Sequence, residues 1–449
     1  MVIAASAAAE TPSGTEKKPA AAGESSQVLT LDQCLKLSMQ NHPAVLAAKY
    51  KLASMKKQLD EAHWAPFFNI GMTTILAPCS TMKGDALHSE EGGEIGDYSE
   101  LGVWIRLEIQ AGFPIFTFGK IKSVWKMAEE GVNIGKMELQ KQVNEIEFET
   151  RRAYLTVVFA RQVRAVLEEG KDYLEDAQEK IDKDLENEEG EATLTDQLKV
   201  KTYMAQVESQ IIQIKKLEEI ALSGLRFLTG KIAIEISEET IEVEEGSLKP
   251  LSWYVAEAKK NRPEFFILDS ALKVSKANLK LAKSKFLPDF FLVGKYTYAY
   301  ADKVEPQNTP FAHDPWNTNS GGVALVMNYP FDFVPNYFRT DKAKAQVLAV
   351  KAQKEAATGM FVMEVEKAYN EAKSLDESYQ VLKKGKKAAK GWIVATNQNY
   401  QAGLAELKDF TDALVTYFSL TAEYYKMIYD YDVALSQLRL VTGTDKILQ

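Results

Sequence analysis

The sequence has no surplus of positive charge and no long apolar run. Its 449 residues include 54 Lys or Arg and 63 Asp or Glu, which gives a net charge of −9. Binding of nucleic acid requires an excess of Lys and Arg on some face, so we expect no nucleic acid partner. The lack of a stretch of about 18 apolar residues excludes a transmembrane helix, but not the short alternating strands of a membrane barrel.

Cysteine and histidine are scarce too. The two cysteines, Cys34 and Cys79, are too few for a disulfide framework, and we expect the first in a helix and the second in a loop. The four histidines lack metal-ligand spacing, so no metal site is predicted. No nucleophile elbow or phosphate-binding loop is present. We therefore expect neither a cofactor nor an enzymatic activity.

Proline is absent from residues 115–249 and 336–449. A proline inside a helix costs about 3 kcal/mol or more, so such stretches favour long helices. The helical pattern continues from about Lys120 to Glu186, roughly 100 Å at 1.5 Å per residue, and we expect a second such helix from about Asn336 to Tyr400. Apolar positions in these stretches recur at alternate spacings of three and four, which predicts coiled-coil packing.

The first residues are small and apolar. Residues 2–9 resemble the end of a secretory signal peptide, although an Ala-rich tail is the alternative. The Ala, Ser, Gly, Pro and Lys that follow predict a flexible linker. We assign residues 1–27 to a signal-peptide remnant and this linker.

The remaining chain is duplicated. Asn41-His42-Pro43 returns as Asn261-Arg262-Pro263 after 220 residues, and the ending at Thr229-Gly230 returns as Thr442-Gly443 after 213 residues. The Thr-Gly endings predict helix C-caps, and Thr30 with Gln33 predicts a capping box. Such repetition indicates two repeats, which we place at residues 28–247 and 248–449.

Each repeat contains two strand patterns. In Val103–Gln110 the odd positions are all apolar and the even ones polar or Trp, which is the period of a strand. Strands of about ten residues suit a tilted crossing of a bilayer. Polar loops would join them, and Pro114 and Pro330 would stand where strands give way to helices. The predicted strands cover about residues 67–76, 101–111, 289–300 and 320–329.

Four strands leave open edges, which cannot remain unpaired in lipid. We therefore expect the chain to close a barrel with further copies of itself. The residues do not set the number of copies.

The pattern Leu-Thr-Leu-x-x-Cys-Leu from Leu29, the Asn-x-Pro elements, Pro114 before Ile115-Phe116 and the Leu-x-x-x-Thr-Gly endings resemble the TolC family over about residues 28–445. The resemblance implies a mainly α fold with a β hairpin in each repeat. It also implies a homotrimer with a twelve-stranded transmembrane β-barrel and a long helical barrel in the periplasm. The implied location is the outer membrane, in contact with its lipid, and the implied partners are a periplasmic adaptor protein and an inner-membrane pump.

The resemblance also assigns an adaptor-contact tip. It lies at two turns, one around Gly190 and one formed by Ala402, Gly403 and Leu404, which is similar to a Val-Gly-Leu turn of the family. The first turn departs from the family, because Glu191 stands where Leu is expected.

A periplasmic gate is implied next to that tip. Asp409 and Asp412 fall where the family has constriction aspartates, three residues apart on one helix face, and a trimer would hold two rings of three carboxylates. Tyr400 and Asp196 match positions that bridge neighbouring helices, and Ala405 replaces an arginine that often pairs there. The alternative for the two aspartates is a pair of solvated acids after a turn.

The predicted function is a passive exit duct of a tripartite efflux or type I secretion system, for small molecules or proteins. A non-pore, structural coiled-coil protein of the periplasm is the alternative. That alternative explains the helical seams and the acidity, but not the alternating strands.

Overall fold

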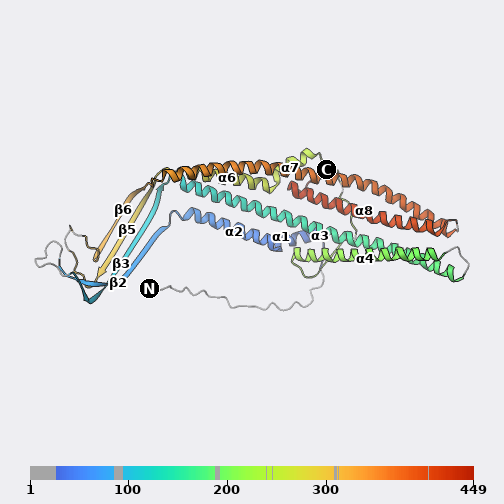
Figure 1. Cartoon of the computed structure of the whole chain (residues 1–449), viewed down its shortest axis with the longest axis horizontal. Coiled ribbons are helices and arrows are strands. Elements are labelled where there is room, and N and C mark those ends of the chain that lie inside the picture. Colours follow the sequence, from blue (N-terminus) through green and yellow to red (C-terminus); the bar gives the residue numbers. More distant parts are fainter. Residues whose placement is uncertain are drawn as a thin grey trace. The chain divides into compact units, whose positions relative to one another are not determined.

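The computed structural model describes residues 27–84, 95–187, 193–238, 240–244, 246–307, 311, 313–402 and 404–448. Of the expected signal-peptide remnant and linker, only Gln27 falls within them. Figure 1 shows the long helices and the group of strands. The helices are α1 (Leu31–Asn41), α2 (Pro43–Trp64), α3 (Lys120–Asn187), α4 (Leu194–Thr229), α5 (Leu251–Asn261), α6 (Pro263–Ser284), α7 (Phe333–Gln401) and α8 (Leu407–Thr442). The strands are β1 (Gln27–Leu29), β2 (Asn69–Met82), β3 (Ile95–Phe116), β4 (Ile234–Ile236), β5 (Asp289–Ala301) and β6 (Thr318–Asn328).

The helices come in two series of matching length. In chain order, α1 and α5 each have 11 residues, α2 and α6 each have 22, and α4 and α8 each have 36. The helices α3 and α7 have 68 and 69 residues. The two long helices predicted from the missing prolines are therefore confirmed, with ends within three residues of those expected. Within the described ranges, no helix is both long enough and apolar enough to cross a membrane.

The helix ends follow local rules that the sequence displays. The predicted capping box is present, since Thr30 N–H donates to Gln33 Oε1 at 3.1 Å and Gln33 N–H donates to Thr30 Oγ1 at 3.4 Å. Gly230 and Gly443 close α4 and α8 in the left-handed conformation, with φ of 71° and 67°. This conformation is strained for residues with a Cβ atom, so both predicted glycine caps are confirmed.

The four long strands form one antiparallel sheet in the order β2-β3-β5-β6. In the register, Ile105, Leu107 and Ile109 of β3 lie opposite Tyr300, Tyr298 and Tyr296 of β5. We call this side the apolar face. It continues onto β6 through Val323, Leu325 and Met327, which are 71%, 66% and 59% exposed.

The other side of the sheet is polar. There Glu108 accepts from Arg106 at 3.0 Å and from Lys295 of β5 at 2.7 Å. Alternation along each strand separates the two kinds of side chain, so one sheet presents apolar and charged surfaces back to back.

Two expectations about the strands were wrong. Pro114 lies inside β3, opposite Phe291, and the pairing is irregular between Pro114 and Phe116. A proline lacks the N–H of the ladder, so an irregularity of this kind accommodates it. The strand β2 also runs to Met82, so Cys79 is in a strand and not in a loop, 3% exposed beside Ala301. This part of β2 is held by its pairing with β3, from Ala77 opposite Trp104 to Ser80 opposite Leu101. Pro330, by contrast, stands between β6 and α7 as predicted.

The chain divides into two compact units. One contains residues 1–42, 149–243 and 379–430, and the other contains residues 43–148, 244–378 and 431–449. In the first unit, β1 and β4 pair in parallel, and a core forms around Cys34, Val157 and Leu225. A further cluster lies near the end of α7 and the start of α8, with Leu174, Ile181, Val200, Phe410 and Leu414 buried together. The second unit contains the four-stranded sheet.

Candidate functional site

The predicted gate aspartates lie at the start of α8. Asp409 is in its first turn, with its N–H donating to Glu406 O at 3.1 Å, and Asp412 follows three residues later. Both side chains are exposed, whereas Phe410, Thr411 and Ala413 between and beside them are buried. The helix therefore holds its apolar side in the core and presents the two carboxylates together to solvent. A helix N-terminus also stabilises the negative charge of Asp409.

Tyr400 lies close to these residues. Its ring stacks on Phe410, with centroids 5.6 Å apart and planes 12° from parallel, and the ammonium group of Lys180 lies 5.9 Å from the ring centroid. Burial raises the pKa of the Tyr400 hydroxyl, and the negative charges of Asp184 and Asp196 raise it further. Tyr400 is therefore a neutral, packed residue at neutral pH that couples the end of α7 to the start of α8.

Asp196 is the N3 residue of α4 and caps that helix. Its Oδ2 accepts from Thr193 N at 3.1 Å and from Thr193 Oγ1 at 2.6 Å, while Thr193 Oγ1 accepts from Asp196 N at 3.2 Å. Sequence reasoning missed this role, although the Thr-x-x-Asp spacing is the signal of a capping box. In the structure this carboxylate accepts the capping hydrogen bonds of α4, and its predicted bridge to a neighbouring helix stays a prediction.

The predicted tip is described in part. Gly190, Glu191 and Gly403 lie outside the described residues. Ala402 closes the end of α7 with its N–H donating to Gln398 O at 3.1 Å, and Leu404 N–H donates to Asn399 O at 2.8 Å. Leu404 is 79% exposed, so the turn presents an apolar side chain to solvent.

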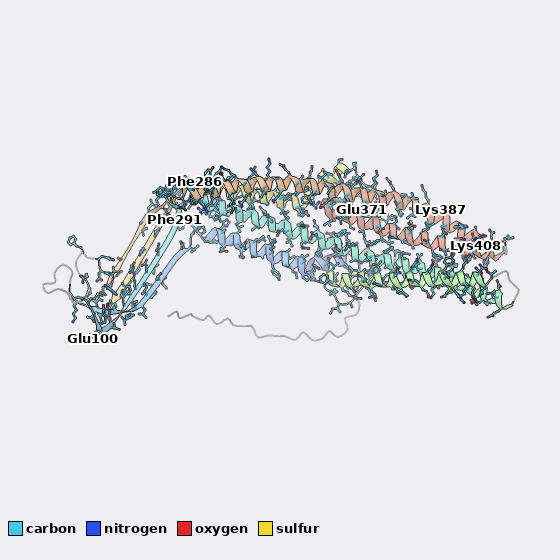
Figure 2. The ribbon with its side chains drawn as sticks, viewed as in Figure 1. Glu100, Phe286, Phe291, Glu371, Lys387 and Lys408 are labelled. Atoms are coloured by element: carbon cyan, nitrogen blue, oxygen red, sulfur yellow. The ribbon has the colours of Figure 1, made fainter. Side chains whose placement is uncertain are left out.

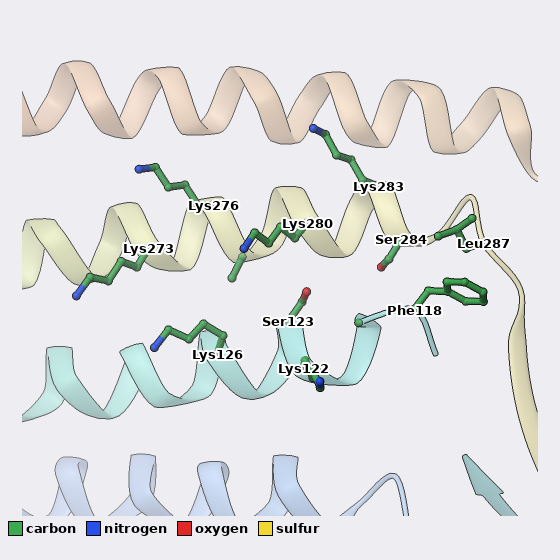
Figure 3. Close-up of a pocket in the computed structure, with 12 residues that line it drawn as sticks. Phe118, Lys122, Ser123, Lys126, Lys273, Lys276, Lys280, Lys283, Ser284 and Leu287 are labelled. Carbon is green, nitrogen blue, oxygen red and sulfur yellow. The ribbon is translucent and has the colours of Figure 1, made fainter. Parts of the chain in front are cut away.

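A basic groove in the second unit was not foreseen from the sequence. It has a volume of about 630 Å³ and lies between the start of α3 and the end of α6 (Figure 3). We call it the lysine groove; its lysines are Lys122, Lys126, Lys273, Lys276, Lys280 and Lys283. The signal was present as a spacing of 3, 4 and 3 from Lys273 to Lys283, which puts four ammonium groups on one helix face.

In the part of the chain that the structure describes, no three His, Cys, Asp or Glu side chains form a group that could hold a metal ion. The two aspartates of α8 form a negative surface, and the lysine groove forms a positive one. Each can attract ions of the opposite sign.

Residues 254–444 match the sequence model of the outer membrane efflux protein family. No curated protein matches the chain in sequence.

Several solved structures share the fold. The outer-membrane channel OprN has a TM-score of 0.75 at 15% identity, with 92% of this chain and 89% of that chain covered. The CmeC outer membrane channel of Campylobacter jejuni has a TM-score of 0.74 at 14% identity, covering 92% and 85%. The open state of the MtrE outer membrane channel of Neisseria gonorrhoeae has a TM-score of 0.74 at 16% identity, covering 92% and 88%.

At these identities the structures show a shared fold, and the family model supplies the sequence evidence. Both concern outer-membrane proteins, in agreement with the location that the resemblance implied. Residues 254–444 thus carry the sequence pattern of the outer membrane efflux protein family, and the chain shares the fold of these outer-membrane channels, which agrees with the resemblance to the TolC family.

Proposed function

We propose that the chain is one protomer of a homotrimeric exit duct in the outer membrane. The observation that carries this proposal is the four-stranded sheet, whose apolar face is exposed and whose outer strands β2 and β6 each pair on one side only. An exposed apolar face is stable in lipid, and unpaired edges are not. Three copies would close a barrel of twelve strands, with the charged side around Glu108 facing the lumen.

The proposed duct is passive and serves a tripartite efflux or type I secretion system. The long helices α3 and α7 would extend it through the periplasm, and the exposed Leu404 and Ala402 would meet the adaptor protein. We also infer that residues 28–247 and 248–449 are two repeats, because their helices match in length from α1 and α5 to α4 and α8.

Exposed aromatic residues support the position of the membrane boundary. They gather where the strands meet the helices, beside the partly buried Phe286 and Phe291 that mark the junction of α6 and β5 in Figure 2. Aromatic side chains are enriched at both interfaces of membrane proteins. Those at least 49% exposed near these junctions are Trp64, Phe68, Phe113, Phe116, Phe331 and Phe333.

Membrane insertion and conductance test this proposal together. The purified protein should fractionate with outer membranes and give discrete ion-conducting steps in a planar bilayer. A protein that remains in the soluble fraction and conducts nothing would instead support the structural coiled-coil alternative.

We further propose that Asp409 and Asp412 form the constriction of the duct. In a trimer their exposed carboxylates would face one another, and closely held like charges bind multivalent cations. Replacing both with Ala should weaken block by a trivalent cation by about tenfold, because the two rings supply most of that attraction. Single-channel recordings at fixed ionic strength measure the effect.

A matched control is available on α3. Asp172 and Asp176 are also exposed and lie on one helix face, and their double replacement with Ala makes the same change in charge. Unchanged cation block in the Asp409→Ala/Asp412→Ala protein would rule out this constriction and leave the two residues as solvated acids.

A further inference from the structure

The lysine groove contains more lysines than the neighbouring carboxylates of the chain can pair. Lys126 lies 3.2 Å from Glu129 and 3.0 Å from Glu130, and Lys273 lies 3.9 Å from Glu130. Among the described residues, no carboxylate lies within ion-pair distance of Lys122, Lys276, Lys280 or Lys283. Ammonium groups of like charge at helical spacing repel one another, so an anion bound among them would stabilise the site.

The floor of the groove leaves room for such an anion. Buried small residues, Ser123 of α3 and Ala277 and Ser284 of α6, lie at its base. The lysines are exposed and come from both helices; in Figure 3 Lys273 and Lys280 lie toward α3, whereas Lys276 and Lys283 extend from the other side of α6. Flexible stems of this kind let several ammonium groups converge on one bound group.

One end of the groove is apolar and continuous with the sheet. Phe118 and Leu287 line this end, and the ring of Phe118 lies 4.6 Å from that of Phe116 and 6.4 Å from that of Phe290. Phe290 pairs with Phe116 on one side and with Met327 on the other. Met327 belongs to the apolar face, so this face runs directly into the groove.

We propose that the lysine groove binds the phosphate of an anionic phospholipid in the periplasmic leaflet of the outer membrane. The acyl chains would lie on the apolar face beyond Phe118, and the phosphate would lie among Lys122, Lys276, Lys280 and Lys283. This inference rests on the proposed function, because it requires the sheet to be in a membrane. A free phosphate ion would make no use of the apolar end, and an ethanolamine headgroup would bring its own ammonium among the lysines. The expected ligand is therefore a lipid with a net negative charge, such as phosphatidylglycerol.

The test compares lipid binding by the full-length protein in nanodiscs that contain phosphatidylethanolamine with or without phosphatidylglycerol. Native mass spectrometry counts the lipids that stay bound. The variant Lys122→Gln/Lys276→Gln/Lys280→Gln/Lys283→Gln should retain at least about tenfold less phosphatidylglycerol than the unaltered protein, because each lysine contributes attraction to the anionic headgroup. The corresponding four Lys→Arg substitutions keep the charge and should preserve retention.

A charge-matched control comes from α7. Lys367, Lys384, Lys387 and Lys390 are exposed outside the groove, and their replacement with Gln should leave retention unchanged; Lys387 is labelled in Figure 2. Equal retention of the two lipids, or full retention by the groove variant, would overturn the proposal. Displacement of the lipid by inorganic phosphate at equal concentration would show a free-anion site and would also overturn it.

Conductance of the same preparations separates this inference from the function on which it rests. A protein that inserts and conducts but shows no preference for phosphatidylglycerol contradicts only the lipid site. A protein that neither inserts nor conducts contradicts the exit duct itself.

Discussion

Replacing Asp432 with Asn is expected to stabilise the protein at pH 8 and to remove much of the dependence of its stability on pH. Asp432 lies on α8 and is 7% exposed, and one of its carboxylate oxygens is buried without a hydrogen-bond partner. Burial raises its pKa from 3.8 to about 7. A hydrogen bond from the backbone of Glu244 and the charge of Arg439 lower this pKa, and the charge of Glu244 raises it, so burial dominates.

The direction of the pH effect follows from where the proton is bound. Below about pH 4 the carboxyl group is protonated in both the folded and the unfolded chain and contributes nothing. Between about pH 4 and 7 the folded chain keeps the proton while the unfolded chain releases it, so the free energy of unfolding falls as the pH rises. Above pH 7 the folded protein carries the full penalty, which for a pKa raised from 3.8 to about 7 is about 4 kcal/mol.

The measurement is the free energy of unfolding of both proteins between pH 4.5 and 8. Asn keeps the shape of Asp without its charge, so the variant should gain roughly 3 kcal/mol at pH 8 and little at pH 4.5. Asp445→Asn, an exposed change on the same C-terminal segment, should have little effect. A variant less stable than the unaltered protein at pH 8 would show that the buried carboxylate is stabilised by its surroundings.

Gly443→Ala should destabilise the protein much more than the equivalent change Gly230→Ala. Both glycines are left-handed, so each alanine costs about 1 kcal/mol from backbone strain. A Cβ atom on Gly443 would lie 3.0 Å from the backbone C and O atoms of Asn261, whereas one on Gly230 would lie 3.4 Å from the side chain of Asn41. Backbone atoms cannot move aside as a side chain can, so we expect a total loss of about 3 kcal/mol at Gly443.

Unfolding by denaturant measures the two losses in parallel, and each variant serves as the control of the other. The capping role is the same in both helices, so the difference isolates the contact with Asn261. Equal losses of unfolding free energy in the two variants would show that backbone strain alone causes the destabilisation. The segment at Asn261 would then move aside without a loss of stability.

The sequence alone predicted those features that depend on neighbouring residues in the chain. The long helices α3 and α7 follow from stretches without proline, and Gly230 and Gly443 were recognisable because a helix often ends at a left-handed residue. Such features can be predicted from residues that lie only a few positions apart in the sequence.

Features that depend on distant residues were predicted less well. The last part of β2 was assigned to a polar loop, and its pairing with β3, as at Cys79 opposite Gly102, appears only in the folded chain. The lysine groove escaped notice because Lys122 and Lys280 are far apart in sequence and meet only in the folded chain. The two aspartates at the start of α8 were proposed as a constriction by resemblance, since a site shared by several chains would leave no pattern within one.

The matched lengths of the helices restrict how such a chain can change in evolution or by engineering. Removing one residue from the 68 of α3 would rotate every later position by about 100° and move it by 1.5 Å, which would turn its apolar seam away from the core. Removing about seven residues restores the direction of the seam, because seven residues make nearly two turns. Insertions and deletions should therefore occur in steps of about seven residues. A change in α3 should be matched by one in α4, and a change in α7 by one in α8, so that the consecutive helices of each pair keep their relative lengths.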